Sequence, residues 1–168
     1  EFPFIPQTPN LYYFQPTVDT RLNAKLQLFE TSQTIITTVI QKLNQIIRKH
    51  ESKDSEFVKL HVTEKTPPTL QLTKRRAKIL QKNLGDKNLE IPLDDSSESF
   101  YNLKVADIKF VSNKNIEIVS SVQINTLCNT LFTVKEEICA INKRVFSEML
   151  ERFGQYYREF SLFSKYCA

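Results

Sequence analysis

Glycine is scarce in this chain: only 2 of its 168 residues are Gly, and Trp is absent. Tight turns that need a positive φ must therefore be rare, because glycine is the residue that adopts this conformation without strain. A protein built from many short strands needs more turns of this kind. The scarcity of glycine thus predicts a mainly helical fold.

Long apolar runs and paired cysteines are also missing. No stretch of about 18 apolar residues occurs, so no membrane-spanning helix is expected. The three cysteines, Cys128, Cys139 and Cys167, are odd in number and include no C-x-x-C pair. We therefore expect free thiols in a reducing intracellular compartment, without a distinction between nucleus, mitochondrion and viral compartment.

The motifs of catalysis and cofactor binding are absent too. Gly85 and Gly154 fit no G-x-x-x-x-G-K-[ST] phosphate-binding loop, so the chain is not expected to hydrolyse ATP. His50 and His61 have no partners at metal-ligand spacing. The loop predicted over residues 86–99 is acidic but lacks the order of a calcium-binding loop; its carboxylates include Glu90, Asp94, Asp95 and Glu98. We expect no catalytic residues, no metal site and no cofactor.

Two long helices dominate the hydrophobic pattern. The first is predicted within residues 19–56, where a coiled-coil-like seam comprises Leu22, Leu26, Phe29, Ile36, Ile40, Leu43 and Ile47. The second is predicted within residues 115–168, where steps of three and four join Ile124, Leu127, Leu131, Val134, Ile138, Ile141 and Val145. A stutter follows at Met149, so one bent helix and two helices joined near residues 152–160 both remain open.

A small α+β segment, residues 57–114, separates the two helices. "FVKLHVTE" (57–64) and "TLQLT" (69–73) alternate with period two, and "KTPP" between them predicts a β-hairpin. Thr73 then N-caps a short helix that Gly85 ends. "LKVADIKFVSN" adds one or two strands. We predict a mainly α fold in which two antiparallel helices carry this segment, preceded by a proline-rich extended arm or loose tail, residues 1–18.

Basic residues gather in the predicted short helix. They are Lys74, Arg75, Arg76, Lys78 and Lys82, with Lys65 in the preceding turn. Such a group fits the phosphate backbone of a duplex, and the absence of aromatic residues within it argues against stacking on unpaired bases. Short basic helices are also common as solvated surfaces, and the heptad-like seams alone would suit a coiled-coil scaffold that recruits a protein partner. These alternatives stay open on the residues alone.

The order of the segments, together with three stretches of local sequence, resembles the lever-and-clamp region of the MutS family of DNA mismatch-repair proteins. "FVKLHVTEKTPPTLQLTKRRAKIL" is similar to the passage into the clamp, and "VADIKFVSNKNIEIVSSVQINTL" to the passage that leads out of it. "EEICAINKRVFSEMLERFGQYYREFSLFSKYCA" resembles the descending lever helix. The frequent use of Ile, Lys, Asn and Phe suggests an AT-rich coding genome, such as that of an organelle or a large DNA virus. The likeness spans roughly residues 20–168, although the acidic loop 86–99 maps to no family feature.

The resemblance implies a role that composition does not establish. Clamp segments of this family touch duplex DNA without sequence preference, and levers connect them to an ATPase. Lys65, Lys74, Arg75, Arg76, Lys78 and Lys82 then become candidate backbone contacts. The ATPase and mismatch-reading modules, and a dimer partner, would belong to a longer parent protein. Phe146-Ser147-Glu148 has the letters of the family's Phe-x-Glu wedge, but its place in a long helix favours helix packing.

Overall fold

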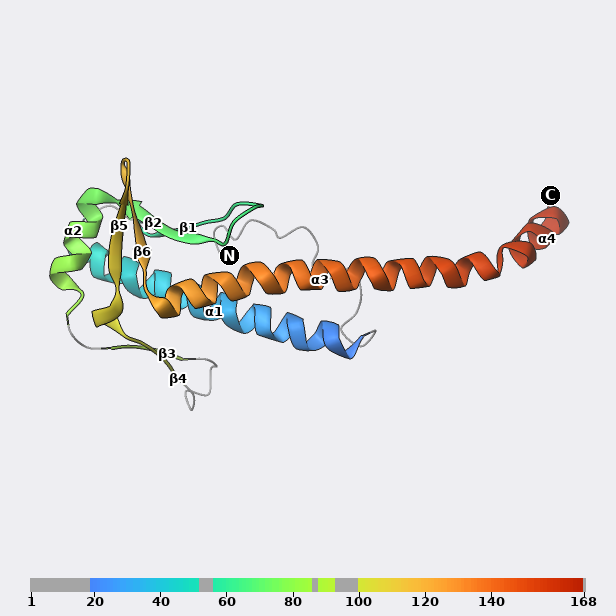
Figure 1. The fold of residues 1–168 in the computed structure, drawn as a ribbon, viewed down its shortest axis with the longest axis horizontal. Helices are drawn as coiled ribbons and strands as arrows, with labels where there is room; N and C mark the ends of the chain where they lie inside the picture. Colours follow the sequence, from blue (N-terminus) through green and yellow to red (C-terminus); the bar gives the residue numbers. More distant parts are fainter. Residues whose placement is uncertain (1–18, 52–55, 86–87, 93–99, 168) are drawn as a thin grey trace. The chain divides into compact units, whose positions relative to one another are not determined.

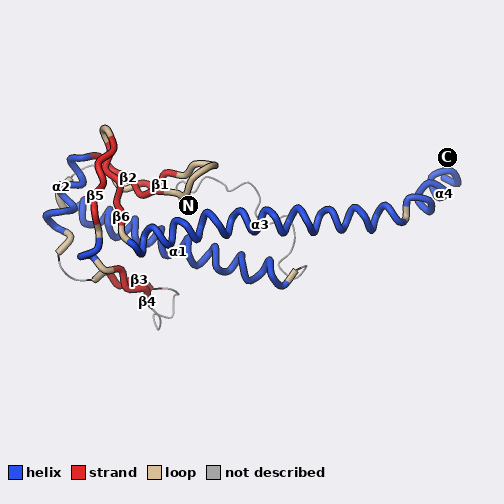
Figure 2. Tube along the Cα trace, in the orientation of Figure 1, coloured by secondary structure: helices blue, strands red, loops and turns tan. Residues whose placement is uncertain are grey.

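The computed structural model describes residues 19–51, 56–85, 88–92 and 100–167, and of Cys167 it describes only the backbone. The proline-rich arm predicted over residues 1–18 lies outside the described residues. The described part is mainly helical, with four α-helices and a small antiparallel sheet, as Figures 1 and 2 show. The chain divides into two compact units, residues 27–134 and residues 1–26 with 135–168.

The long helices are α1 (Thr20–Arg48) and α3 (Val122–Gln155), and α3 is followed by α4 (Tyr157–Cys167). The predicted first helix is confirmed. Its seam is buried except at Ile40, which is half-buried. At the other end of the chain, α3 and α4 meet at Tyr156, so the prediction of two helices with a joint near residues 152–160 is the correct alternative.

The second long helix begins later than the sequence analysis placed it. Residues 115–121 were expected within the helix, but Ile116–Ser120 forms strand β6. Three of its five residues are β-branched, which favours an extended backbone. A two-residue turn before β6 reverses the chain, because Lys114 adopts a positive φ of 49°. The strand lies directly before the helical spacing that starts at Ile124, so the sequence analysis placed the boundary between strand and helix too early.

The larger sheet has the strand order β1-β2-β6-β5, and all of its neighbouring strands are antiparallel. Its strands are β1 (Lys59–His61), β2 (Thr69–Thr73), β5 (Lys109–Asn113) and β6. The predicted hairpin is confirmed as β1 and β2, although β1 is shorter than "FVKLHVTE". A separate two-stranded sheet pairs β3 (Leu89–Pro92) with β4 (Phe100–Leu103). A short 3₁₀ turn, Val105–Asp107, leads from β4 into β5.

Strand β3 corrects the prediction of a continuous acidic loop over residues 86–99. Leu89–Pro92 is extended and paired, with Ile91 fully buried and Glu90 exposed on the alternate side. The apolar–polar alternation of "LEIP" is a strand signal that its acidic neighbours obscured. The other four carboxylates of the predicted loop lie outside the described residues: Asp86, Asp94, Asp95 and Glu98.

The unit of residues 27–134 holds the sheets, α2 (Lys74–Asn83) and a core of aliphatic side chains. Its fully buried residues include Ile36, Val39, Leu43, Ile47, Val58, Leu70, Leu80, Ile91 and Leu103. A buried amide fixes the chain after α1. Asn44 Oδ1 accepts hydrogen bonds from the backbone N–H groups of Phe57 (3.0 Å) and Val58 (2.8 Å), and its Nδ2 donates to the Val58 carbonyl (3.3 Å). These bonds satisfy backbone groups that no strand ladder reaches.

In the other unit, the start of α1 pairs with α3 in antiparallel sense. Lys25 forms an ion pair with Glu137 at 2.6 Å, and Asp19 forms one with Arg144 at 3.2 Å, so the residue numbers run in opposite directions. Asp19 also caps α1, because its Oδ1 accepts the backbone N–H of Arg21 at 2.8 Å. The side-chain hydrogen bond from Arg21 is the main reason that the pKa of Asp19 is lowered.

Candidate nucleic-acid interface

Helix α2 carries five of the six predicted contact residues. It starts directly after β2, with Thr73 at the N-cap in an extended conformation. The predicted N-cap position is confirmed, although the Thr73 side chain makes no capping hydrogen bond. At the other end Gly85 has a φ of +67°, the left-handed conformation that commonly follows a helix. The local sequence therefore defines both ends of α2.

One side of α2 is fixed to the sheet. Ala77 and Leu80 are buried, and α2 contacts β2 and β6 (Figure 1). Ile79 and Leu84, the other apolar residues at this helix, are only half-buried. Burial at residues 77 and 80 decides which side of α2 faces away from the sheet.

The remaining side presents what we call the cationic arc: Lys74, Arg75, Lys78 and Lys82. At about 100° per residue these four positions fall within roughly one quarter of the helix circumference. All four residues are exposed. Among the residues that the structure describes, no carboxylate forms an ion pair with Lys74, Lys78 or Lys82. The arc is therefore a set of cations with room for an anionic partner.

Arg76 belongs to a different environment. It lies on the flank of α2 next to the buried side, and its side chain is 25% exposed. The guanidinium stands over the Phe57 ring, 4.4 Å from the centroid, and its Nε donates a hydrogen bond to Glu51 Oε2 at 3.4 Å. Stacking and pairing of this kind hold an arginine in place. Arg76 therefore attaches α2 to the segment after α1, which leaves it less available than the cationic arc.

Glu51 is the acidic residue that sequence reasoning missed. Its carboxylate also pairs with Arg75, with Glu51 Oε1 3.5 Å from Arg75 Nε. The Glu51 side chain is only 10% exposed, whereas that of Arg75 is 82% exposed. Glu51 lies 24 residues before Arg75 in the sequence, so no local pattern indicates the contact. One carboxylate thus neutralises part of the positive charge at the start of α2.

Lys65, the sixth predicted contact, is exposed in the turn between β1 and β2. That turn enters β2 at Thr69, whereas α2 leaves β2 after Thr73, so the two lie at opposite ends of the strand. Five strand residues span about 17 Å. The structure therefore brings five of the predicted residues together on α2 and leaves Lys65 apart from them.

The charge of α2 conflicts with helix stability. Lys74, Arg75 and Arg76 occupy the first turn, which holds no acidic residue. The N-terminus of a helix is the positive end of its dipole, where cations are unfavourable and anions favourable. Glu51 offsets only part of this. A cluster of cations that the fold itself does not favour is more readily explained by an anionic partner than by stability.

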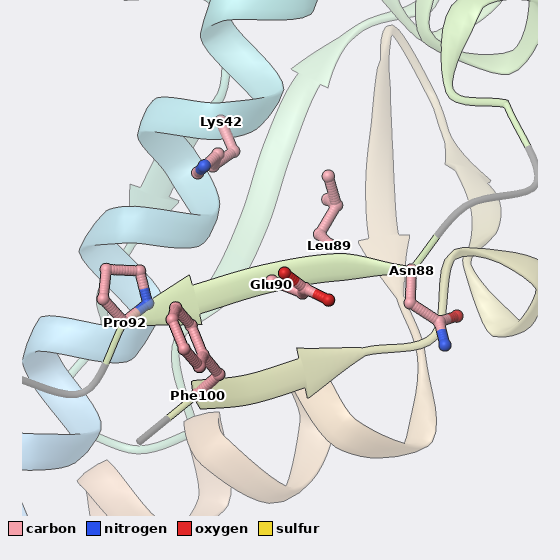
Figure 3. A pocket seen from close by; sticks show the side chains of 6 residues that line it. All are labelled: Lys42, Asn88, Leu89, Glu90, Pro92 and Phe100. Atoms are coloured by element: carbon pink, nitrogen blue, oxygen red, sulfur yellow. The ribbon is translucent and has the colours of Figure 1, made fainter. Parts of the chain in front are cut away.

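A second candidate binding site in the same unit is less suited to an anionic ligand than the cationic arc. A hollow of about 650 Å³ beside β3 and β4 is lined by Lys42, Asn88, Leu89, Glu90, Pro92 and Phe100 (Figure 3). Among the described residues that line it, one cation, Lys42, is matched by one carboxylate, Glu90, so these residues have no net charge to attract a phosphate. Within the described ranges, no group of three or more His, Cys, Asp or Glu side chains is placed to hold a metal ion.

The described cysteines and helices add neither a reactive thiol nor a membrane-spanning segment to these features. Cys128 and Cys139 are both free, and burial raises the pKa of the Cys128 thiol to about 11, which makes it a poor nucleophile at neutral pH. The side chain of Cys167 is not described. None of the helices in the described part of the chain is both long and apolar enough to cross a bilayer.

Comparison with known proteins adds no family to these observations. No protein-family model matches the chain, and a sequence search of curated proteins finds no match. Any function for this protein therefore depends on the residues and geometry described above.

Proposed function

We propose that this protein binds the phosphate backbone of duplex DNA without sequence preference, as the lever-and-clamp segment of a MutS-like mismatch-repair protein. The observation that carries the proposal is the cationic arc, in which Lys74, Lys78 and Lys82 are exposed and make no ion pair with a described carboxylate. Lysine and arginine neutralise phosphates and release condensed counterions. The arc contains no aromatic side chain to stack on an unpaired base, which favours a duplex over a single strand.

The resemblance to the MutS family supplies the second part of the proposal. Antiparallel pairing of α1 with α3 is what two levers require, and the described sheets and α2 lie between them in the sequence. On this proposal the ATPase, the mismatch-reading module and a dimer partner belong to the parent protein, and an intracellular, reducing compartment suits its thiols. This chain then acts by binding, not by catalysis.

Charge removal tests the proposal. A fluorescent duplex is titrated at 50 mM salt with the unmodified chain and with the Lys74→Gln/Lys78→Gln/Lys82→Gln variant. We expect the variant to lose affinity by at least about tenfold, because three phosphate contacts are removed. The control variant, Lys135→Gln/Lys143→Gln/Lys165→Gln, has the same net charge and should bind like the unmodified chain. Equal binding by both variants would remove the cationic arc from the account.

A second function, a helical scaffold that recruits a protein partner, is favoured by one observation. Beyond Val145 the helices α3 and α4 expose many large apolar side chains, which include Phe146, Leu150, Phe153, Tyr157, Phe160 and Phe163. Exposed apolar surface of this extent is typical of an interface. Phe146, the first letter of the Phe-x-Glu match, belongs to this surface and is half-exposed.

Sedimentation velocity over a wide concentration range tests the scaffold function. Self-association that Phe153→Ser/Phe160→Ser abolishes would support it, because removal of two large apolar side chains weakens such an interface. A monomer at all concentrations that still binds duplex DNA would favour the first proposal.

A further inference from the structure

The register of the larger sheet divides its side chains between two faces. Successive side chains of a strand point to opposite faces, and paired residues of neighbouring strands point to the same one. Lys59 pairs with Gln71, Gln71 with Ile118, and Ile118 with Val111. His61, two residues after Lys59, pairs with Thr69, and Lys109, two residues before Val111, pairs with Ser120. These residues therefore share one face, which we call the open sheet face.

Burial shows which face is covered. On the opposite face Leu70, Leu72 and Val119 are buried in the core. On the open sheet face Lys59, His61, Lys109 and Val111 are exposed, and Gln71 and Ile118 are half-buried. The open sheet face is thus accessible in the described part of the unit, across all four strands.

The two charged side chains on the open sheet face, Lys59 and Lys109, are both cations. Lys59 and His61 lie on edge strand β1, and Lys109 lies on the other edge strand, β5. The one carboxylate within these four strands, Glu117, pairs with Leu72 and Ser112, so it belongs to the opposite face. The central strand β2 adds Thr69 and Gln71. Gln71 Nε2 donates to Thr69 Oγ1 at 3.0 Å, and each side chain keeps one further proton that it can donate to a phosphate oxygen. The Ser120 hydroxyl instead donates to Asn125 Oδ1 at 3.3 Å.

We propose that the open sheet face is a second contact surface for duplex DNA, in which Lys59 and His61 bind phosphates on one side of a groove and Lys109 binds phosphates on the other. Three interstrand steps of about 4.8 Å separate the two edges by roughly 14 Å. This separation is similar to the major-groove width of about 12 Å. The inference rests on the proposed function for its ligand, but it uses none of the residues of α2.

The side chains of this face do not favour a protein partner. Its apolar content is the neighbouring pair Val111 and Ile118, with Ile116 half-buried beside Asn113. That is far smaller than the apolar centre of a stable protein interface. Charged residues on edge strands also discourage pairing with other chains, which gives Lys59 and Lys109 a purely structural explanation. The two explanations differ in what happens when both lysines are neutralised.

The experiment compares two variants of the complete chain for binding of a fluorescent duplex between 50 and 200 mM salt. One variant is Lys59→Gln/Lys109→Gln, and the matched control is Lys143→Gln/Lys165→Gln, which removes two exposed charges from α3 and α4. We expect the sheet variant to bind about three- to tenfold more weakly at 50 mM salt. Its plot of log K against log salt concentration should be shallower by roughly 2, since each lost phosphate contact contributes about 0.9. The control should match the unmodified chain.

The inference would be overturned if the sheet variant bound DNA as tightly as the unmodified chain, and the edge-strand explanation would then stand. It would also be overturned if the control variant lost as much affinity as the sheet variant.

The α2 variant Lys74→Gln/Lys78→Gln/Lys82→Gln, measured in parallel, separates failure of this inference from failure of the proposed function. Loss in the α2 variant alone rejects the open sheet face but keeps the cationic arc. Loss in the sheet variant alone rejects the arc and keeps the sheet. No binding by the unmodified chain at 50 mM salt rejects both. Circular dichroism and thermal midpoints confirm that each variant is folded.

Discussion

Glu51 connects stability and charge at the scale of single residues. Its nearly buried carboxylate pairs with Arg75 and Arg76 at 3.5 and 3.4 Å, and Arg76 in turn covers the Phe57 ring. The pair with exposed Arg75 is worth little in water, whereas the partly buried pair with Arg76 contributes more. Within this arrangement Glu51 competes with any external anion for Arg75.

The variant Glu51→Gln should therefore change stability and DNA binding in opposite directions. Loss of both ion pairs should lower the free energy of unfolding by about 1 kcal/mol, measured by urea denaturation. Affinity for duplex DNA should rise by a few-fold, because both guanidinium groups lose an internal carboxylate. Glu136→Gln removes the same charge from an exposed position of α3 and should leave stability nearly unchanged. Weaker DNA binding by Glu51→Gln would contradict the competition.

Helix α2 gives a matched pair of substitutions at the scale of one element. Lys74 stands in its first turn and Lys82 in its last, and both belong to the cationic arc. Lys74→Glu places an anion at the positive end of the helix dipole and should stabilise the protein by about 0.5 kcal/mol. Lys82→Glu places one at the negative end and should destabilise it by a similar amount.

Both substitutions should weaken duplex binding to a similar extent, since each reverses one charge of the same arc. Thermal midpoints and DNA titrations of the two variants provide the comparison. If binding followed stability, so that Lys74→Glu bound more tightly than the unmodified chain, the cationic arc would be only a solvated surface.

Elements with one dominant periodicity were predicted correctly from the sequence. The seam of α1 and the β1–β2 hairpin followed from spacing and turn residues. The spacing after Met149 left both one bent helix and two helices open, and the structure has two. Strands β3 and β6 were not predicted, because four- and five-residue strands carry little periodicity and lie beside acidic or helical sequence. Pairing with β4 stabilises β3, and pairing with β5 and β2 stabilises β6. The contact of β6 with β2 joins segments more than 40 residues apart, which no local pattern indicates.

The candidate interface divides in the same way. Four cations on one side of α2 could be predicted, because helical spacing alone brings them together. The contacts of Arg76 with Phe57 and Glu51, which remove it from the cationic arc, could not be predicted. These two partners lie about 20 residues earlier in the sequence and meet α2 only in the folded chain. The distance of Lys65 from α2 likewise depends on the length of β2 between them.

At the scale of the whole molecule, the two compact units differ in what they expose. Residues 27–134 carry the cationic arc and the open sheet face, whereas α3 beyond residue 145 and α4 expose large apolar side chains. A protein with this division can contact a polyanion through one unit and another protein surface through the other. The central claim concerns the first unit: the contact is with phosphates, and it does not depend on base sequence.

The salt dependence of binding to two duplexes of equal length and unrelated sequence tests this claim most directly. Four phosphate contacts by the cationic arc predict a slope of about −3.6 for log K against log salt concentration, and additional contacts make it steeper. The slope and the affinity should agree between the two sequences, because nothing in the arc reads a base edge. A slope near zero, or an affinity that differs by more than about tenfold between the sequences, would contradict the account.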